Sequence, residues 1–313
     1  TDMIGISRPI VKHSFMIKHP SEIPDVMKKA FYLAQSGRPG PVVVDIPKDM
    51  TNPAEKFEYV YPKKAKLRSY SPAVRGHSGQ IRKAVDELLK AKRPVIYSGG
   101  GVVQGDASEA LTAVARKLNY PVTNTLMGLG AYPASGRAWL GMLGMHGLYE
   151  ANLAMHGCDL MINLGARFDD RITGRIDAFS PRSKKAHVDI DPSSINKVIK
   201  ADMPIVGDIA HVLEDVLKIW KARGRRVNRE ALARWWQQIE EWRKVKCLTY
   251  KPSETTIKPQ YALQRLEALT KDRDRYICTE VGQHQMWAAQ YLGFEDPNRW
   301  MTSGGLGTMG YGF

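Results

Sequence analysis

The feature that most constrains the fold is a regular alternation of short apolar segments with longer amphipathic ones between residues 80 and 208. The apolar segments are rich in β-branched residues, as in strands of a parallel sheet, whereas the amphipathic ones have helical spacing. Such alternation predicts an α/β domain with a doubly wound parallel sheet. We expect helices over 80–91, 108–118 and after Asp208, and strands over 94–97, 121–125, 160–164, 186–190 and 205–206.

A helix and a strand are also expected nearer the amino end. Apolar residues at helical spacing predict a helix over 21–36, with Ser21 as its N-cap and Gly37 at its end. The β-branched segment Val42–Val44 then predicts a strand that is apolar on both faces, with Lys48 just beyond its carboxyl end. This is the pattern of a strand in a parallel sheet.

Two segments without periodicity, 53–78 and 251–258, predict linkers between domains. A chain of 313 residues is also long for one compact core, so several domains are expected. The helix predicted over 229–247 carries an apolar stripe that is typical of core packing, made of Trp235, Ile239 and Trp242. Beyond the second linker we expect a helix from Pro259 and a strand over 276–279.

Composition argues against several classes of protein. Charged residues make up 25% of the chain, as in ordinary globular proteins, and no apolar run approaches the roughly 20 residues that span a membrane. Three widely separated cysteines fit neither a disulfide framework nor CxxC metal spacing, so we assign no metal ligands and expect a cytoplasmic compartment. The net charge of +14 would suit nucleic acid, but its densest runs, 61–68 and 221–229, are typical of connections. We therefore expect no nucleic-acid or membrane partner.

Several loops that follow predicted strands could bind ligands, because open α/β sheets bind at the carboxyl ends of their strands. Glycines 99–101 would let backbone N–H groups approach a phosphate, although a tight turn would use the same residues. His146 alone is more often a satisfied polar residue than a ligand. Asp189 and Asp191 could accept ribose hydroxyls, and helix N-capping would explain either of them equally well.

The segment "NLGARFDDRITGR", residues 163–175, places two carboxylates between two arginines directly after a predicted strand. The guanidinium of Arg171 is a planar fork suited to a carboxylate or a phosphate, and Asp170 could hold it in place. A surface cluster of ion pairs explains the spacing as well as a ligand site does.

The motifs together resemble a known family. "GRPGPVVVDIPKDM", "TLMGLGAYP", "MLGMHG", "GARFDDRITGR", "HVDIDP", "VGQHQMWAAQ" and "SGGLGTMGYGF" are similar, in collinear order over almost the whole chain, to the catalytic large subunit of acetohydroxyacid synthase (acetolactate synthase), a thiamine-diphosphate enzyme. The first motif alone would indicate only the wider superfamily. The combination with "GMHG", "RFDDR" and "GQHQMWAA" narrows the resemblance to the synthase.

The resemblance implies three α/β domains: the end of an aminopyrimidine-binding domain over 1–62, a Rossmann-like FAD-binding domain over 63–250, and the beginning of a diphosphate-binding domain over 251–313. It also implies thiamine diphosphate, magnesium, and FAD without a redox role in the main reaction. Its FAD contacts correspond to Arg38, Gly100, Thr125, Leu126, His146, Gly165, Arg167, Asp189 and Asp208. Its thiamine-diphosphate contacts correspond to Gln283, His284, Gly307 and Met309.

The implied transferase reaction condenses pyruvate-derived hydroxyethyl-thiamine diphosphate with pyruvate or 2-ketobutyrate, in branched-chain amino-acid biosynthesis. Arg171 would bind the second substrate's carboxylate and Asp170 would hold Arg171, while Met145 shapes the pocket and Lys48 lies at its entrance. The family also implies a homodimer, or a tetramer with a small regulatory subunit.

The sequence departs from the family pattern in two ways. Leu148 stands where Thr is expected, a change that could alter packing beside FAD. We find neither the glutamate that activates the aminopyrimidine, expected before Thr1, nor the Gly-Asp-Gly magnesium motif, expected after Phe313. The chain is therefore expected to be a segment of a longer protein and to be inactive alone.

Three other functions compete with the synthase. A pyruvate oxidase or 2-keto acid decarboxylase would share the architecture, but a decarboxylase has no second keto acid for Arg171 to bind. An inert FAD-binding module would bind flavin without turnover. A basic nucleic-acid binder would show steep salt dependence and no flavin spectrum.

Overall fold

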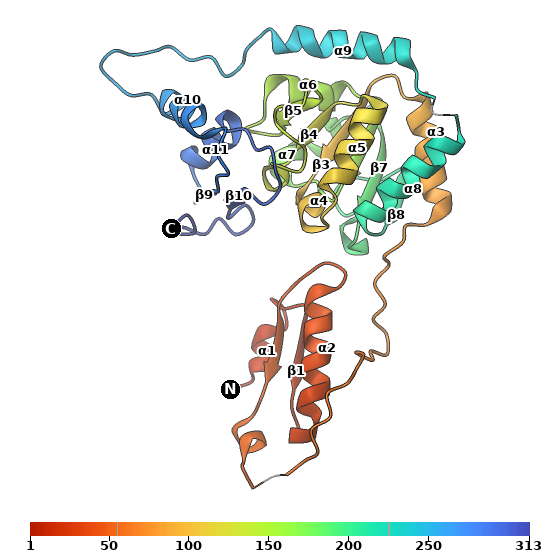
Figure 1. The fold of residues 1–313 in the computed structure, drawn as a ribbon, viewed down its shortest axis with the longest axis vertical. Helices are drawn as coiled ribbons and strands as arrows, with labels where there is room; N and C mark the ends of the chain where they lie inside the picture. Colours follow the sequence, from red (N-terminus) through yellow and green to blue (C-terminus); the bar gives the residue numbers. More distant parts are fainter. Residues whose placement is uncertain (55, 225) are drawn as a thin grey trace. The chain divides into compact units, whose positions relative to one another are not determined.

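The computed structural model describes residues 1–54, 56–224 and 226–313, and its contacts form two compact units, Thr1–Val74 and Arg75–Phe313. Glu55, in the first expected linker, and Arg225, in a basic run, lie outside the described residues. In the first unit a helix packs on two parallel strands (Figure 1). Its elements are α1 (Met3–Ser7), β1 (His13–Met16), η1 (Pro20–Glu22), α2 (Ile23–Gln35), β2 (Val42–Asp45) and η2 (Lys48–Thr51).

The sequence predicted this first unit in part. Helix α2 ends before Gly37, whose φ of +58° confirms the expected stop. Ser21 is not its N-cap, because it lies in the preceding turn η1, where its N–H donates to His19. Strand β2 is half-buried at every position rather than buried on both faces, since within the described unit it pairs only with β1, a strand that the sequence did not reveal.

The segment expected to link the first two domains contains no helix or strand in its described residues, 53–54 and 56–77. Part of it is fixed to the first unit, because the Tyr70 hydroxyl donates to the Ser36 carbonyl at 2.8 Å and accepts from Lys12 Nζ at 3.0 Å. The unit boundary therefore follows Val74. The division at 62 and 250 remains a prediction.

The second unit is built around a six-stranded parallel sheet (Figure 1). Its order is β5-β4-β3-β6-β7-β8, so the chain starts in the middle, moves to one edge, and then returns to build the other half. This is the doubly wound order of dinucleotide-binding domains, which confirms the predicted fold class. The strands are β3 (Pro94–Ser98), β4 (Val122–Asn124), β5 (Trp139–Met142), β6 (Leu160–Leu164), β7 (Lys184–Asp189) and β8 (Met203–Val206).

Amphipathic helices and short connections join these strands. Helix α5 and strand β6 have the bounds that the sequence predicted, whereas α4, α6 and β5 were not expected. The elements outside the sheet are α3 (Ser78–Lys90), α4 (Gly100–Gln104), α5 (Ser108–Leu118), η3 (Leu126–Gly128), α6 (Tyr149–Gly157), α7 (Asp170–Thr173), η4 (Ile176–Ala178), η5 (Pro192–Ser194), α8 (Ile209–Ala222) and α9 (Arg229–Arg243).

Helix α9 confirms that its aromatic stripe is core packing. Trp235 and Ile239 are buried, and the Trp235 indole donates to the Pro94 carbonyl at the start of β3. Trp242 packs edge-on against Trp235, with ring centroids 5.5 Å apart. The helix ends at Arg243, four residues before the predicted end.

The last part of the chain packs against β5 and the loop after β4. After the expected linker, which contains no helix or strand, come α10 (Pro259–Thr270), β9 (Ile277–Thr279), α11 (Gln283–Tyr291) and β10 (Trp300–Thr302). Ala288, Ala289 and Trp300 share an apolar cluster with Met142 and Leu129. Within the described residues, no helix combines the length and apolar character needed to cross a membrane.

Candidate cofactor and substrate site

The loops that follow β3 and β6 meet through glycine backbone. These strands are neighbours at the centre of the sheet, and the chain turns to opposite halves of the sheet after each of them. A Cβ on Gly99 would lie 2.3 Å from the Gly165 carbonyl oxygen, and one on Gly101 would lie 2.7 Å from Gly165 Cα. Gly165 itself has φ +63°. No side chain fits between these loops, so their backbones pack directly on each other, at the point where open α/β sheets bind ligands. We call this packed backbone the glycine floor.

Buried asparagines hold the same loops in place. The Asn163 amide donates to the Ala166 carbonyl at 2.8 Å and accepts from the Ala166 N–H at 3.0 Å, which fixes the loop that carries Gly165. Asn124 likewise donates to the Gly128 carbonyl at 2.7 Å. Sequence reasoning missed both residues, because an asparagine at a strand end gives no signal of which loop it will bind.

Two buried hydroxyls at the carboxyl ends of β3 and β4 have no hydrogen-bond partner within the described part of the chain. They belong to Ser98, which is fully buried, and to Thr125. Buried polar atoms are rarely left unpaired, and polar atoms at a ligand site commonly complete their bonds with the ligand. The glycine floor and these hydroxyls together fit a ligand that carries a diphosphate or a flat ring.

The end of β7 supplies the carboxylate expected at this edge. Asp189 is buried and accepts from the Asp191 N–H at 2.9 Å, while Asp191 caps the turn η5. His187, also buried, places Nε2 3.8 Å from the Asp189 carboxylate, beyond hydrogen-bonding distance. Its ring packs edge-on against Phe168, which has φ +55°. Asp189 therefore lies at the strand end where a ribose hydroxyl could bind, whereas Asp191 acts as the N-cap of η5.

Asp208, another expected flavin contact, is the N-cap of α8. Its side chain accepts from the His211 N–H at 3.1 Å, and the His211 ring nitrogen lies 3.3 Å from the same oxygen. The sequence predicted a helix after Asp208, and capping explains this residue without a ligand. Its other carboxylate oxygen would lie 3.9 Å from a Cβ on Gly105, which places Asp208 beside the end of α4.

The loop "GMHG" and the segment "DDR" form a second part of the site. The Met145 N–H donates to the Arg171 carbonyl at 2.8 Å, so the two segments are joined through their backbones. Asp169 caps α7 by accepting from the Arg171 N–H at 3.1 Å. The side chains of Met145, Asp170 and Arg171 remain exposed. A guanidinium of this kind can bind a small carboxylate, and an exposed thioether can contact an apolar substituent.

Two details of this segment differ from the expected roles. No hydrogen bond or ion pair joins Asp170 to the Arg171 guanidinium in the described structure, and the carboxylate that organises the turn is Asp169. Arg167, the expected flavin contact, lies 3.8 Å from Asp169 in an exposed ion pair. An exposed ion pair therefore explains Arg167 without a ligand. For the Arg171 guanidinium, the described residues supply no ion pair or hydrogen bond.

The remaining expected contacts lie in three places. Leu126 and His146 are half-buried in the loops after β4 and β5, on the side where α11 packs. Gln283 and His284 are exposed at the start of α11, while Gly307 (φ +68°) and the exposed Met309 lie near the end of the chain. Arg38 and Lys48 are exposed residues of the first unit and are described only within it.

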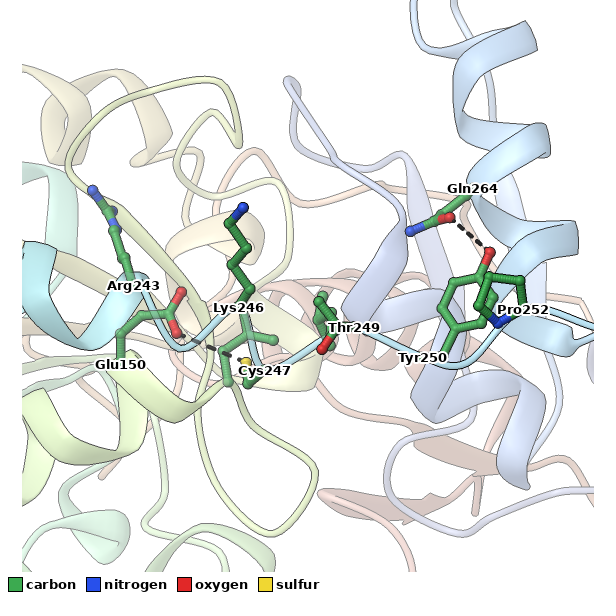
Figure 2. A pocket seen from close by; sticks show the side chains of 10 residues that line it. Glu150, Arg243, Lys246, Cys247, Thr249, Tyr250, Pro252 and Gln264 are labelled. Carbon is green, nitrogen blue, oxygen red and sulfur yellow. Dashed lines mark hydrogen bonds between the residues drawn. The ribbon is translucent and has the colours of Figure 1, made fainter.

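A cavity of about 500 Å³ lies elsewhere, beside the connection between α9 and α10 (Figure 2). Figure 2 shows Glu150 beside Cys247, whose Sγ lies 3.9 Å from the carboxylate, and Tyr250 bonded to Gln264. None of the expected site residues lines it. Among the residues described, no group of three or more His, Cys, Asp or Glu side chains could hold a metal ion.

Comparisons with known proteins agree with this architecture. Residues 81–216 match the family described as "Thiamine pyrophosphate enzyme, central domain", and residues 280–313 match "Thiamine pyrophosphate enzyme, C-terminal TPP binding domain". The two matches together span more than half of the chain, which thus belongs to the thiamine pyrophosphate enzymes.

The similarity to individual relatives extends over the whole chain. The acetolactate synthase isozyme 3 large subunit of Escherichia coli (strain K12) is 51% identical over 311 residues, which are 99% of this chain and 54% of that protein. The large subunit of Haemophilus influenzae is 50% identical over 312 residues, 100% of this chain and 54% of its own length. An acetolactate synthase of Mycobacterium leprae is 44% identical over 311 residues, 99% of this chain and 49% of its own length. The chain therefore spans about half the length of these relatives.

Proposed function

We propose that this chain provides the flavin crevice and the second-substrate site of an acetolactate synthase large subunit. The observation that carries the proposal is the bond between the Met145 N–H and the Arg171 carbonyl, which joins the two most distinctive family motifs. That bond joins the two segments backbone to backbone, and the side chains of Met145 and Arg171 are both exposed. A short 2-keto acid would need a guanidinium for its carboxylate and an apolar side chain for its substituent. The similarity to acetolactate synthase large subunits gives independent support.

The residues of this chain would bind and orient the ligands. The glycine floor and the hydroxyls of Ser98 and Thr125 would hold FAD, with Asp189 at its ribose, and FAD would serve as a structural ligand. The Arg171 guanidinium would bind the carboxylate of pyruvate or 2-ketobutyrate, and Met145 would limit the size of its substituent. Thiamine diphosphate, when bound with magnesium, supplies the electron sink for decarboxylation of pyruvate.

The proposal also covers the division into domains and the assembly of the protein. The domains would be the end of an aminopyrimidine-binding domain over 1–62, a flavin domain over 63–250, and the beginning of a diphosphate-binding domain over 251–313, with Gln283, His284, Gly307 and Met309 on the thiamine side. We also propose a cytoplasmic dimer, or a tetramer with a small regulatory subunit, as the "large subunit" in the relatives' names suggests.

Retention of flavin tests the crevice. The native protein that carries this sequence is saturated with FAD, freed of excess and compared with Asp189→Ala and Arg167→Ala by flavin absorption. We expect the wild type to retain FAD and Asp189→Ala to lose it. Arg167→Ala is expected to weaken binding less, because its side chain is exposed and already paired with Asp169. A wild type that binds no flavin would refute the crevice assignment.

Steady-state kinetics test Arg171. Arg171→Met is expected to raise the KM for the second keto acid about tenfold to a hundredfold, the loss of a charged hydrogen bond of about 1.5–3 kcal/mol. Arg175→Met is the matched control, since Arg175 follows the same short helix and pairs with Asp177 at 2.8 Å. Normal turnover of pyruvate to acetaldehyde, with no condensation product, would favour the alternative decarboxylase.

A further inference from the structure

Side-chain amides from two helices hold the loop that carries Met145 and His146. On one side, the Asn152 side chain of α6 accepts from the Gly144 N–H at 2.8 Å and donates to the Gly144 carbonyl at 2.9 Å. On the other, Gln290 of α11 donates to the His146 carbonyl at 2.8 Å. The loop is therefore fixed both before and after Met145, by half-buried side chains that bond to its backbone.

This loop in turn fixes Arg171. Gly144 has φ +102°, and a Cβ there would lie 2.8 Å from the Arg171 carbonyl oxygen and 2.6 Å from the Ile172 side chain. The next residue, Met145, donates its N–H to that same carbonyl at 2.8 Å. The backbone of Arg171 thus rests directly on the loop, and a shift of the loop would move the guanidinium.

Helix α11 links this loop to the other expected cofactor site. Gln290 lies seven residues, about two turns or 10 Å, after Gln283, so the two side chains project from nearly the same face of the helix. The helix is held against the sheet by its own apolar side, since Ala288, Ala289 and Leu292 pack with Met142 and Leu129. Helix α11 therefore holds Gln290 at a fixed distance from Gln283 at its amino end.

We propose that Gln290, together with Asn152, is a positioning residue for the second keto acid, acting through the loop on Met145 and Arg171. The inference rests on the proposed function, because it assumes that Arg171 binds the acceptor carboxylate. Neither amide touches the acceptor. Each sets the position of the loop backbone, so their loss weakens acceptor binding and leaves the first decarboxylation unchanged.

The test compares variants of the native protein. Gln290→Met keeps the length of the side chain and removes the donor to His146. Its matched control is Glu295→Ala, which removes two other bonds between the last part of the chain and the sheet domain, from Ser135 N and Oγ at 2.8 and 2.6 Å. Asn152→Asp is a second variant, which keeps the acceptor for Gly144 N–H and loses the donor. Flavin content and CO₂ release from pyruvate in a single turnover are measured beside the KM for the acceptor.

We expect Gln290→Met and Asn152→Asp each to raise the acceptor KM about threefold to tenfold, the effect of one hydrogen bond, with flavin content and single-turnover CO₂ release unchanged. Glu295→Ala should leave the acceptor KM at the wild-type value. An unchanged KM in both amide variants, an equal change in Glu295→Ala, or a parallel loss of CO₂ release would overturn the inference. If Arg171→Met leaves the acceptor KM unchanged, the proposed function itself fails, whatever Gln290 does.

Discussion

The two ends of the central sheet treat their buried polar groups differently. At the amino end, Lys185 Nζ donates to the carbonyls of Ser180 and Ser183, at 3.0 and 2.9 Å, and the Asp159 carboxylate accepts two backbone N–H groups at 2.9 Å. At the carboxyl end, the hydroxyls of Ser98 and Thr125 have no partner in the described residues. The groups at the amino end complete their hydrogen bonds within the chain, whereas these two hydroxyls would be completed by the proposed ligand.

This difference separates stability from binding within one sheet. An unpaired buried hydroxyl lowers the free energy of unfolding by about 1–3 kcal/mol. Such a group is therefore expected where a bound ligand supplies its hydrogen bond. Substitutions at the amino end should therefore change the free energy of unfolding and leave ligand affinity alone. Removal of the hydroxyls at the carboxyl end should weaken ligand binding without lowering the free energy of unfolding.

The glycine floor should affect both stability and ligand binding. Gly165→Ala should therefore have the largest effect of the substitutions considered. A Cβ at this position would lie 2.6 Å from Gly101 Cα, and φ is +63°. We expect a loss of about 3–4 kcal/mol in the free energy of unfolding, from overpacking and backbone strain, together with loss of flavin. Gly174→Ala is the control, since Gly174 also has positive φ (+53°) but a Cβ there would meet nothing within 4 Å. Urea denaturation should show a loss of only about 1–2 kcal/mol for it, and equal losses would contradict the steric argument.

Lys185→Ala tests the amino end and should have the next largest effect. The substitution removes two hydrogen bonds and a buried aliphatic stem, so we expect a loss of about 2–4 kcal/mol in the free energy of unfolding. Burial lowers the pKa of the Lys185 ammonium, and removal of that desolvated charge offsets part of the loss. Urea denaturation gives the stability, and flavin titration should give the wild-type affinity. A large change in flavin affinity would contradict the proposal that the amino end of the sheet affects stability and not binding.

Thr125→Val tests the carboxyl end with almost no change in side-chain shape. Because the hydroxyl is buried and has no partner in the described residues, its removal should raise the free energy of unfolding of the flavin-free protein by about 1 kcal/mol. The dissociation constant for FAD should rise about fivefold, the effect of one hydrogen bond. Ser180→Ala at the amino end is the opposite case: it removes a 2.7 Å bond to the Met155 carbonyl and should lower stability by about 1–2 kcal/mol without weakening flavin.

Sequence patterns predicted the elements whose structure is decided locally. Helix α5 and strand β6 have the predicted bounds, because an amphipathic repeat and an apolar strand carry their own signals. Strands β1 (HSFM) and β5 (WLGM) were missed, since each is four residues long and owes its conformation to pairing with a neighbour. Tertiary pairing decides the conformation of such segments, and a single sequence does not show it.

The site was predictable to a similar extent. The glycine loops and the arginine segment were identified because glycine and charge stand out at strand ends. The amides of Asn163, Asn152 and Gln290 were missed, because their roles depend on contacts between segments as far as 144 residues apart. The sequence also led us to assign Asp170 as the carboxylate that holds Arg171, whereas Asp169 is the one that accepts from the Arg171 N–H. Two adjacent aspartates differ only in the direction that the backbone gives their side chains, and a single sequence does not show that direction.

The smallest expected effect concerns an ion pair at the amino end, between Glu87 of α3 and Lys184 at the start of β7, 2.7 Å apart. The hydrogen bond from Lys184 lowers the pKa of Glu87 below its ordinary value of 4.5. A carboxyl whose pKa is lowered in the folded state stabilises the fold above its ordinary pKa and loses that contribution as the pH falls through its folded pKa. Glu87→Gln should therefore be less stable than the wild type at pH 7, and the difference should disappear in acid below the folded pKa.

The matched control for this pair is Asp86→Asn on the same helix, whose partner Arg223 lies 3.1 Å away. The Asp86 side chain is 41% exposed, against 17% for Glu87. Asp86→Asn should lower stability at pH 7 by less than Glu87→Gln does, because exposed pairs are weak. Urea denaturation of both variants and the wild type between pH 3 and about pH 7 makes the comparison. Flavin affinity at pH 7 should stay at the wild-type value in both, because the pair lies at the end of the sheet opposite the proposed flavin site. A Glu87→Gln difference that persists in acid would show that packing, rather than charge, connects α3 to β7.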